Sequence, residues 1–307
     1  MLGHIRNETR YKHQNRWAKA RDVLVASLFI RLPRASVKHV YAFQYKPFRL
    51  AVDVPAPYEM WGSATEVEQI QQARAARNKT TVTHPVDFDF VCRLLAQRLG
   101  VTIPQLLRAA SAAVTQQHCP SEKLVVVWLA KPLIVELAMQ AHPERERFAW
   151  VDAAFNAYRY RRRLPARPPP WDLFWPERGL AFRKLPGGCH NEVRPGANHS
   201  SCPIATFFYG SRGAWNRFTG RYLERVRELV VAPTQGMLCT EQDVMADVLQ
   251  GRADEQLGEE FTTSDASGWG WKQAQRVSVR CGRGSFNLGN TCVPERAMGS
   301  PGFDAKW

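Results

Sequence analysis

The amino-acid sequence predicts an α/β fold, a single domain in which a mostly parallel central sheet is flanked by helices. Short apolar runs, of which Val23 to Ile30 is the first strong example, alternate with longer segments of helical composition. A continuous apolar run is typical of a strand that is buried on both faces, as in a parallel sheet. Strands that alternate with helices favour such a sheet with helices on both sides. Because 45% of the 307 residues are hydrophobic, the chain can bury a sizeable core.

The first part of the chain contains three predicted strands and three predicted helices. The strands are residues 23–30, 48–54 and 79–83, and we expect the last of these at an edge of the sheet. The helices are residues 64–78, 88–99 and 104–117. Thr65 with Glu68 three positions later has the arrangement of a capping box, and Pro104 after Thr102 is typical of the first turn of a helix.

The second part of the chain begins with a helical pattern from Lys123 to Gln140, in which Pro132 is expected to break or kink the helix. Phe148 to Asp152 follows as a short apolar strand that ends in a carboxylate. The remaining predicted elements are a strand at 203–209, helices at 214–230 and 240–249, and a strand at 276–280. Thr240 is the expected N-cap of the second of these helices.

The domain is expected to span residues 22–281. Residues 1–21 are polar and basic without an apolar period, and we predict a flexible arm there. Residues 159–200 are predicted to form a basic insertion rich in Pro and Gly, with Arg161 to Arg163 in a solvated loop. The Gly-rich residues 282–307 are predicted to be a disordered tail.

The charge balance indicates an anionic partner. The chain has 42 Lys and Arg against 28 Asp and Glu, a formal net charge of +14. Nucleic acid, a membrane surface and a phosphorylated small molecule would each fit this charge, which does not choose among them. The first apolar run is far shorter than the roughly 20 residues that span a bilayer, so we expect neither a transmembrane nor a secretory segment.

The seven cysteines favour a reducing compartment. Their number is odd and no two form a C-x-x-C pair, which fits free thiols in the cytoplasm better than a disulfide framework. Cys189, His190, His199 and Cys202 offer four potential zinc ligands within a short stretch, but their spacing matches no standard zinc motif. We interpret them as part of a loop rich in Gly and Asn, and we expect no zinc site.

Asp152 is the first candidate for a functional side chain. In an open α/β sheet, ligands bind at the carboxyl ends of the strands, and Asp152 directly follows an apolar strand. A carboxylate there can bind a divalent cation or a ribose hydroxyl, and both would hold a nucleotide diphosphate. An aspartate that only caps the next turn would have the same position in the sequence, so position alone leaves both interpretations open.

Three further stretches give this carboxylate a context. In chain order, these stretches are Lys131-Pro132-Leu133-Ile134-Val135-Glu136-Leu137-Ala138, His142-Pro143 and Phe148-Ala149-Trp150-Val151-Asp152-Ala153. They resemble the K-P-x-L-x-x-x-A, N-P and F-x-W-V-D-A-G signature of the HtrL/YibB family, which is described as a family of bacterial glycosyltransferases. Phe207 to Gly210, Trp215 and the run Thr240-Glu241-Gln242-Asp243 are similar to later motifs of that family. The resemblance covers about residues 22–275.

The resemblance implies a GT-A fold, a Rossmann-like α/β domain that binds a nucleotide-sugar donor, usually with Mn²⁺ or Mg²⁺. Asp152 would then bind the metal or the donor, Arg74 or Arg77 would face the nucleotide base or phosphates, and Lys131 would lie near the diphosphate. Gly210 and Trp215 would belong to the donor site as well, with the Trp215 ring stacked on a sugar. Glu241, Gln242 and Asp243 would line the acceptor side, where a carboxylate can deprotonate an attacking hydroxyl.

Two departures from the family pattern leave metal dependence open. Asp152 is followed by Ala153 and Ala154 where many such enzymes have a second acid, and no histidine follows His199. The departing nucleoside diphosphate still needs a cation or basic side chains to stabilise its charge. Lys272 or Arg276 is a candidate for that clamp.

The sequence therefore predicts a cytoplasmic glycosyltransferase that moves a sugar from a nucleotide-diphosphate donor to a hydroxyl of a glycan, protein or lipid acceptor. Two alternatives stay open. One is a basic protein that binds or packages nucleic acid through phosphate contacts. The other is a non-catalytic protein that binds a nucleotide sugar without turning it over.

Overall fold

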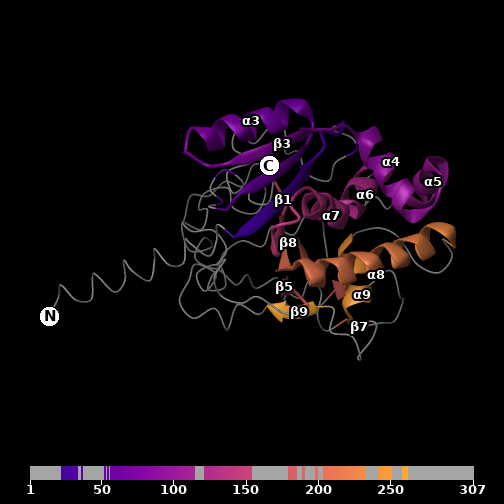
Figure 1. Cartoon of the computed structure of the whole chain (residues 1–307). Helices are drawn as coiled ribbons and strands as arrows, with labels where there is room; N and C mark the ends of the chain where they lie inside the picture. The colour runs from indigo at the N-terminus through magenta and orange to yellow at the C-terminus, as the bar shows by residue number, and fades with distance from the viewer. Residues whose placement is uncertain are drawn as a thin grey trace, which may run out of the picture.

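A computed structural model of the chain describes residues 22–33, 36, 52, 54, 56–114, 121–153, 179–184, 189–190, 198–199, 203–232, 241–250 and 258–261. In these residues the chain forms one sheet of seven strands with helices packed on its two faces (Figure 1). The strand order is β3-β2-β1-β4-β8-β5-β9. A second, two-stranded sheet pairs β6 with β7 in antiparallel orientation.

The strands are β1 (Val23–Phe29), β2 (Tyr58–Gly62), β3 (Thr81–Pro85), β4 (Arg147–Val151), β5 (Leu180–Lys184), β6 (Cys189–His190), β7 (Asn198–His199), β8 (Pro203–Ser211) and β9 (Gly258–Phe261). The helices are α3 (Ala64–Ala75), α4 (Phe88–Leu99), α5 (Ile103–Ala112), α6 (Glu122–Leu129), α7 (Lys131–Ala141), α8 (Arg212–Val231) and α9 (Glu241–Gln250). Strands β3, β2, β1 and β4 run parallel to one another, β8 runs antiparallel to both β4 and β5, and β9 runs parallel to β5. The predicted α/β class with a mostly parallel sheet is confirmed.

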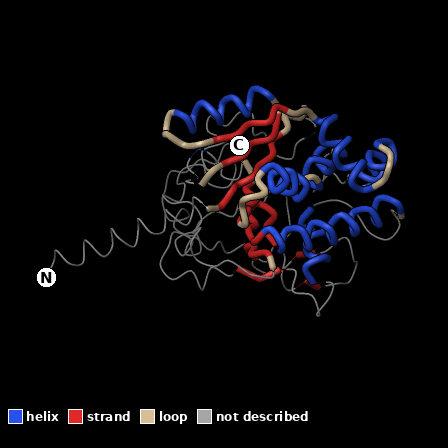
Figure 2. The backbone as a smooth tube through the Cα atoms, viewed as in Figure 1, coloured by secondary structure: helices blue, strands red, loops and turns tan. Residues whose placement is uncertain are grey.

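Burial on both faces of the sheet explains the continuous apolar run of β1. Successive side chains of a strand point to opposite faces. Leu24 and Ala26 lie in the larger part of the core, with the helices α4 to α9. Val23 and Val25 lie in the smaller part, with Val67 and Ile70 of α3. Figure 2 shows α3 on one side of the sheet and the other helices together on the opposite side.

Most of the predicted elements are present in the structure, with shifted ends. The helix at 88–99 has the predicted bounds, and the next one begins at Ile103 after Thr102, whose hydroxyl forms a capping box with Gln105. The segment from 123 to 140 is divided into α6 and α7, because Pro132 lies in the first turn of α7, where a missing N–H leaves no hydrogen bond unmade. The edge strand at 79–83 is confirmed as β3.

Three predictions need correction. The N-cap of α3 is Ser63 and not Thr65. Strand β2 at Tyr58–Gly62, which pairs with β1, is not among the predicted strands. The predicted strand at 48–54 lies mostly outside the described residues. Leu180–Lys184, which was assigned to the Pro- and Gly-rich insertion, is strand β5 of the main sheet. The arm at 1–21, Thr240, the strand at 276–280 and the tail lie outside the described residues, so those predictions stand untested.

One stretch of the described residues, Glu122–Ala141, is apolar and long enough to cross a membrane by length and composition alone, with a mean hydropathy of 1.7. It consists of α6 and α7, and 67% of the apolar window is buried inside the domain. Leu129, Leu133 and Ile134 are fully buried against the sheet and the other helices. The position of α6 and α7 in the core accounts for their apolar character.

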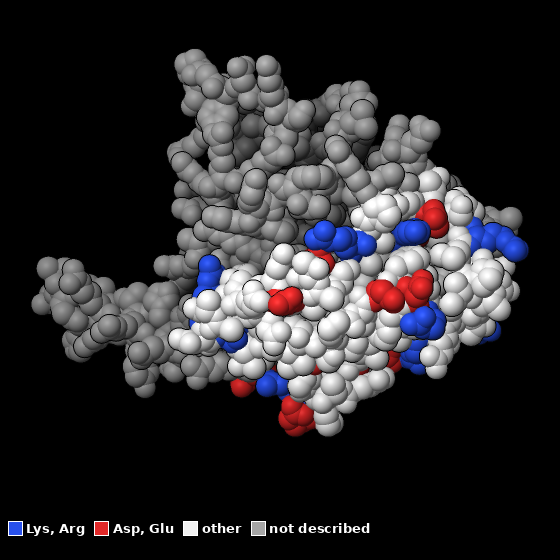
Figure 3. All heavy atoms as spheres, turned by 90° about the horizontal axis from the view of Figure 1, so that it is seen from above, with Lys and Arg blue, Asp and Glu red and all other residues white. Residues whose placement is uncertain are grey.

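Charged side chains of both signs are interspersed among the described residues on the face that carries α3 (Figure 3). An electrostatic footprint for nucleic acid is a stripe or patch of one sign. The described part of this face therefore has no feature that favours nucleic acid over another anion, and the +14 net charge is a property of the whole chain.

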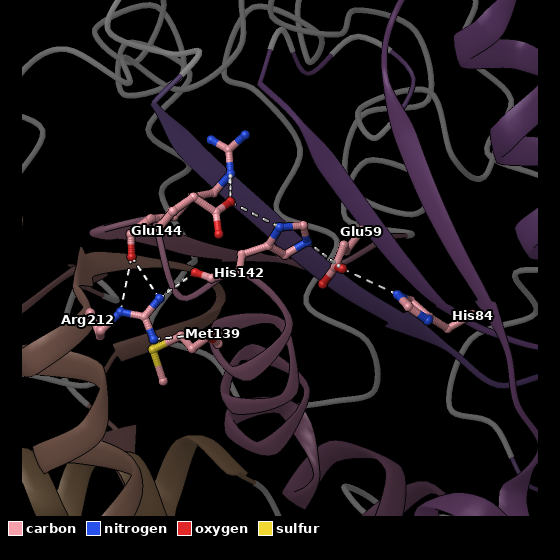
Figure 4. A network of polar contacts seen from close by, with 7 residues as sticks. Glu59, His84, Met139, His142, Glu144 and Arg212 are labelled. Carbon is pink, nitrogen blue, oxygen red and sulfur yellow. Dashed lines mark hydrogen bonds and ion pairs between the residues drawn. The ribbon is translucent and has the colours of Figure 1, made fainter.

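A buried carboxylate fastens the C-terminal end of α7 to the strands β2 and β3. Glu59 of β2 is 1% exposed, and its Oε1 is hydrogen-bonded with Nε2 of His142 at 3.0 Å and with Nε2 of His84 at 3.3 Å. Figure 4 shows the two imidazoles on opposite sides of this carboxylate. The ring of His84 also stacks on Trp61, with ring centroids 3.8 Å apart.

Arg212, the first residue of α8, binds backbone carbonyl groups in the last turn of α7 and in the residues that follow it (Figure 4). Its guanidinium donates to the carbonyl oxygens of Met139 at 2.9 Å, of Arg145 at 2.8 and 3.0 Å, and of His142. The last carbonyls of a helix have no partner within the helix. Arg212 therefore caps α7 and fixes α8 against it.

We expect Glu59→Ala to destabilise the protein by about 2 to 3 kcal/mol, because both imidazoles lose a buried hydrogen-bond partner and a buried space is left. The measurement is the free energy of unfolding in urea. Glu68→Ala on the exposed side of α3 is the matched control and should change that free energy by less than about 0.5 kcal/mol. Equal effects of the two substitutions would show that the Glu59 contacts do not hold this corner together.

Candidate functional site

The lengths of α7 and β4 bring Lys131 next to Asp152. Helix α7 has 11 residues and rises about 16 Å, and the five residues of β4 extend about as far in the opposite direction. The short connection between them, residues 142–146, turns the chain back. The first residue of the helix, Lys131, therefore lies level with Asp152, which follows the last residue of the strand.

A second pair of elements closes the same site. Strand β8 runs antiparallel to β4 with Phe207 opposite Val151, so Ala205 lies just past the end of β4. Helix α9 is tied to the beginning of β8, because the Gln242 side-chain amide donates to the carbonyl of Pro203 at 2.9 Å. Glu241, the first residue of α9, thereby reaches Lys131.

Lys131, Asp152 and Glu241 form one cluster. Lys131 Nζ lies 2.8 Å from Asp152 Oδ1, forms a short ion pair with Glu241 Oε1, and donates to the carbonyl of Ala205 at 3.2 Å. An ammonium has three donors and no acceptor, so these three oxygens use all of its hydrogens. The indole Nε1 of Trp150 also donates to Asp152 Oδ1, at 3.0 Å. We call Lys131, Asp152 and Glu241 the Lys131 cluster.

Burial makes the charges of the Lys131 cluster depend on one another. Burial alone would lower the pKa of Lys131, but the carboxylates of Asp152 and Glu241 outweigh it and raise this pKa well above its usual range. Burial raises the pKa of Glu241, an effect that the Lys131 ammonium opposes and the Asp152 carboxylate reinforces. Lys131 is therefore an ammonium at neutral pH. Asp152 is the most accessible member, with 21% of its side chain exposed.

Tyr222 of α8 forms part of the wall behind Glu241. Its side chain is fully buried, and its hydroxyl has no hydrogen-bond partner among the described residues. Burial raises the pKa of Tyr222 well above its usual value, and the Glu241 carboxylate adds to this. The tyrosine stays neutral and packs against Phe218, with ring centroids 5.8 Å apart.

On the other face of the sheet, a buried hydrogen-bond relay supports the end of β4. The backbone pairing of β1 with β4 ends at Ala26 and Trp150. Beyond that point the Ser27 hydroxyl donates to the carbonyl of Val151 and accepts from the Tyr58 hydroxyl at 2.6 Å. This relay holds the residue that directly precedes Asp152, and burial raises the pKa of Tyr58 to about 12, so its proton stays in place.

Arg74 packs against the ring of Tyr58, at one end of this relay, and does not reach the Lys131 cluster. It is fully buried, its guanidinium carbon lies 4.7 Å from the centroid of the Tyr58 ring, and its donors bind the carbonyls of Val54 and Ala56 at 2.9 Å. Burial lowers the pKa of Arg74 to about 10. The expectation that Arg74 faces the donor nucleotide is corrected: α3 leads back from β2 to the start of β3, so its last turn lies at the amino ends of the strands. Arg77 follows at this same end, exposed.

Two more predicted donor-site residues are used by the core. Trp215 is 1% exposed and its Nε1 donates to the carbonyl of Phe148 at 3.0 Å, so its ring presents no face to a sugar. A Cβ on Gly210 would lie 2.6 Å from Leu180 Cδ2 and 3.1 Å from the carbonyl oxygen of Gly179, so this position is packed closely against β5 and the residue before it. Asp243 is buried on α9, and Lys272 and Arg276 lie outside the described residues.

The structure also adds residues that sequence reasoning missed. Ser27, Tyr58 and Glu59 were not predicted to have a role, although Ser27 is the one hydroxyl within the apolar run of β1 and Glu59 is a charge within a buried strand. Among the described residues, no group of three or more His, Cys, Asp or Glu side chains is arranged to hold a metal ion.

Comparison with known proteins adds little to this description. No family model matches the chain, and no curated protein matches its sequence. The structure is similar to that of mouse xyloside xylosyltransferase 1 in its apo form, at 9% sequence identity and a TM-score of 0.41, over 78% of this chain and 84% of the other.

We expect Ser27→Ala to destabilise the protein by about 1 to 3 kcal/mol, because it leaves the Val151 carbonyl and the Tyr58 hydroxyl buried without partners. Tyr58→Phe removes only one end of the relay and should cost about 1 kcal/mol. Urea unfolding of both variants and of the double variant measures this. Because the two hydroxyls share one hydrogen bond, the double variant should lose less than the sum of the single losses. Strict additivity would argue against a relay.

Proposed function

We propose that the protein is a glycosyltransferase of the GT-A type, which transfers a sugar from a nucleotide-diphosphate donor to a hydroxyl acceptor. One observation carries the proposal. Asp152, Lys131 and Glu241 come from three segments distant in sequence and meet at the carboxyl end of β4. In α/β sheets this edge is where ligands bind. These are also the residues singled out by the resemblance to the HtrL/YibB family.

In this proposal Asp152 is the residue that contacts the donor. Its known contacts, from Lys131 and Trp150, both use Oδ1. Oδ2 is the oxygen that we assign to a hydroxyl of the ribose or of the sugar. The Lys131 ammonium fixes the rotamer of Asp152, and a carboxylate held in place before binding loses less entropy when the donor arrives.

Glu241 is the candidate for the acceptor side. The residue is 4% exposed, and burial raises its pKa, a direction that makes a carboxylate a better proton acceptor near neutral pH. Gln242 orients α9 through Pro203, so we assign it a positioning role. Asp243 remains a proposed member of the acceptor side. Lys272 and Arg276 remain candidates for the cationic clamp on the departing diphosphate.

The experiment is a donor screen with a matched pair of variants. Purified protein is mixed with UDP- and GDP-sugars, and binding is followed by thermal shift and by mass spectrometry of the released nucleotide. We expect one donor class to raise the melting temperature of the wild type, and Asp152→Asn to weaken its binding by about tenfold or more. Asp89→Asn, the same change at an exposed site on α4, should bind like the wild type.

Two results would overturn the proposal. One is a folded wild type that shows neither a shift nor nucleotide release with any donor, in the presence or absence of Mn²⁺. The other is a donor that binds Asp152→Asn and the wild type equally well.

A further inference from the structure

The Lys131 ammonium lies in a cradle of oxygens. Its Nζ lies 2.8 Å from Asp152 Oδ1 and 3.2 Å from the carbonyl oxygen of Ala205. It also forms a short ion pair with Glu241 Oε1. Carboxylates and backbone carbonyls are the ligands that hard divalent cations prefer. The cradle has the chemistry of a cation site, and a side chain of the protein itself fills it.

A divalent metal does not fit beside this side chain. Lys131 is 6% exposed, and the two carboxylates keep it charged by raising its pKa. A second cation bound to the same oxygens would meet strong repulsion where there is little water to screen it. The described residues also offer no third acid or histidine with which Asp152 and Glu241 could complete a metal site. The donor set therefore disagrees with the Mn²⁺ or Mg²⁺ that a GT-A fold would imply.

We infer that Lys131 is the resident cation of this site and takes the place of a divalent metal, so that the site binds its ligand without one. Lys131 is then a positioning residue, because all three of its donors hold oxygens of the protein. The negative charge of a diphosphate must be met by other basic groups. The statement about the ligand rests on the proposed function, whereas the statement about the metal does not.

The test uses Mn²⁺ alone with the full chain and isothermal titration calorimetry. The wild type and Asp152→Asn should give the same weak or undetectable heat of binding. Lys131→Ala removes the ammonium and leaves two carboxylates and a carbonyl around an open space. This variant should therefore bind Mn²⁺ at least about tenfold more tightly than the wild type. The gain should disappear in the double variant Lys131→Ala with Asp152→Asn.

The inference is overturned if the wild type binds Mn²⁺ tightly and Asp152→Asn abolishes that binding, since the cradle would then hold the metal despite Lys131. It is also overturned if folded Lys131→Ala gains no affinity for Mn²⁺. If Lys131→Ala does not fold on its own, its thermal stability is measured with Mn²⁺ and with propylammonium, which replaces the part of the lysine side chain beyond Cβ. Both cations should restore the thermal stability, and rescue by propylammonium without rescue by Mn²⁺ would overturn the inference.

A donor titration in EDTA separates this inference from the proposed function. Unchanged donor affinity in EDTA supports both, and affinity that is lost in EDTA and restored by Mn²⁺ contradicts the inference alone. Absence of any donor binding contradicts the proposed function, while the Mn²⁺ titrations still decide the role of Lys131.

Discussion

The ion pairs between the Lys131 ammonium and the carboxylates of Asp152 and Glu241 are the interaction on which the candidate site depends. Each of these residues begins or follows a different element: α7, β4 and α9. Buried charges are costly to desolvate, and removing one partner leaves the others uncompensated. Moving any one of the three elements away would leave a buried charge without its partner, so the Lys131 cluster holds the three elements together. It also fixes the rotamer of Asp152, its most accessible carboxylate.

The rest of the domain keeps this cluster in register from two directions. On one face of the sheet, the relay from Arg74 through Tyr58 and Ser27 holds the Val151 carbonyl where the pairing of β1 with β4 ends. At the far end of α7, Glu59 and Arg212 hold the last turn and the residues that follow it. Helix α7 is thus fastened at both ends, and its length sets the distance between the two fastenings.

The sequence was sufficient for the features that depend on local pattern. The continuous apolar run of β1, the opening of α5 after Thr102 and the strand that precedes Asp152 could all be predicted, because hydrophobic period and the proline of a first helical turn are local properties. The structure brings Lys131 and Glu241 beside Asp152, and the roles that the family resemblance implied for them stay predictions. The sequence did not place Arg74, because the end of the sheet that it occupies follows from the direction of a crossover helix. It did not place Trp215, since an aromatic ring in a core and one that stacks on a sugar have the same helical spacing. Ser27 gained its meaning only when β4 was known to be the neighbour of β1.

Lys131 and Glu241 act as one coupled unit, and a double-mutant cycle measures this coupling directly. The free energy of unfolding is measured for the wild type, Lys131→Met, Glu241→Gln and the double variant. The account predicts that the double variant loses less stability than the sum of the single losses, with a coupling of more than about 1 kcal/mol. Additive losses, within about 0.5 kcal/mol, would contradict it.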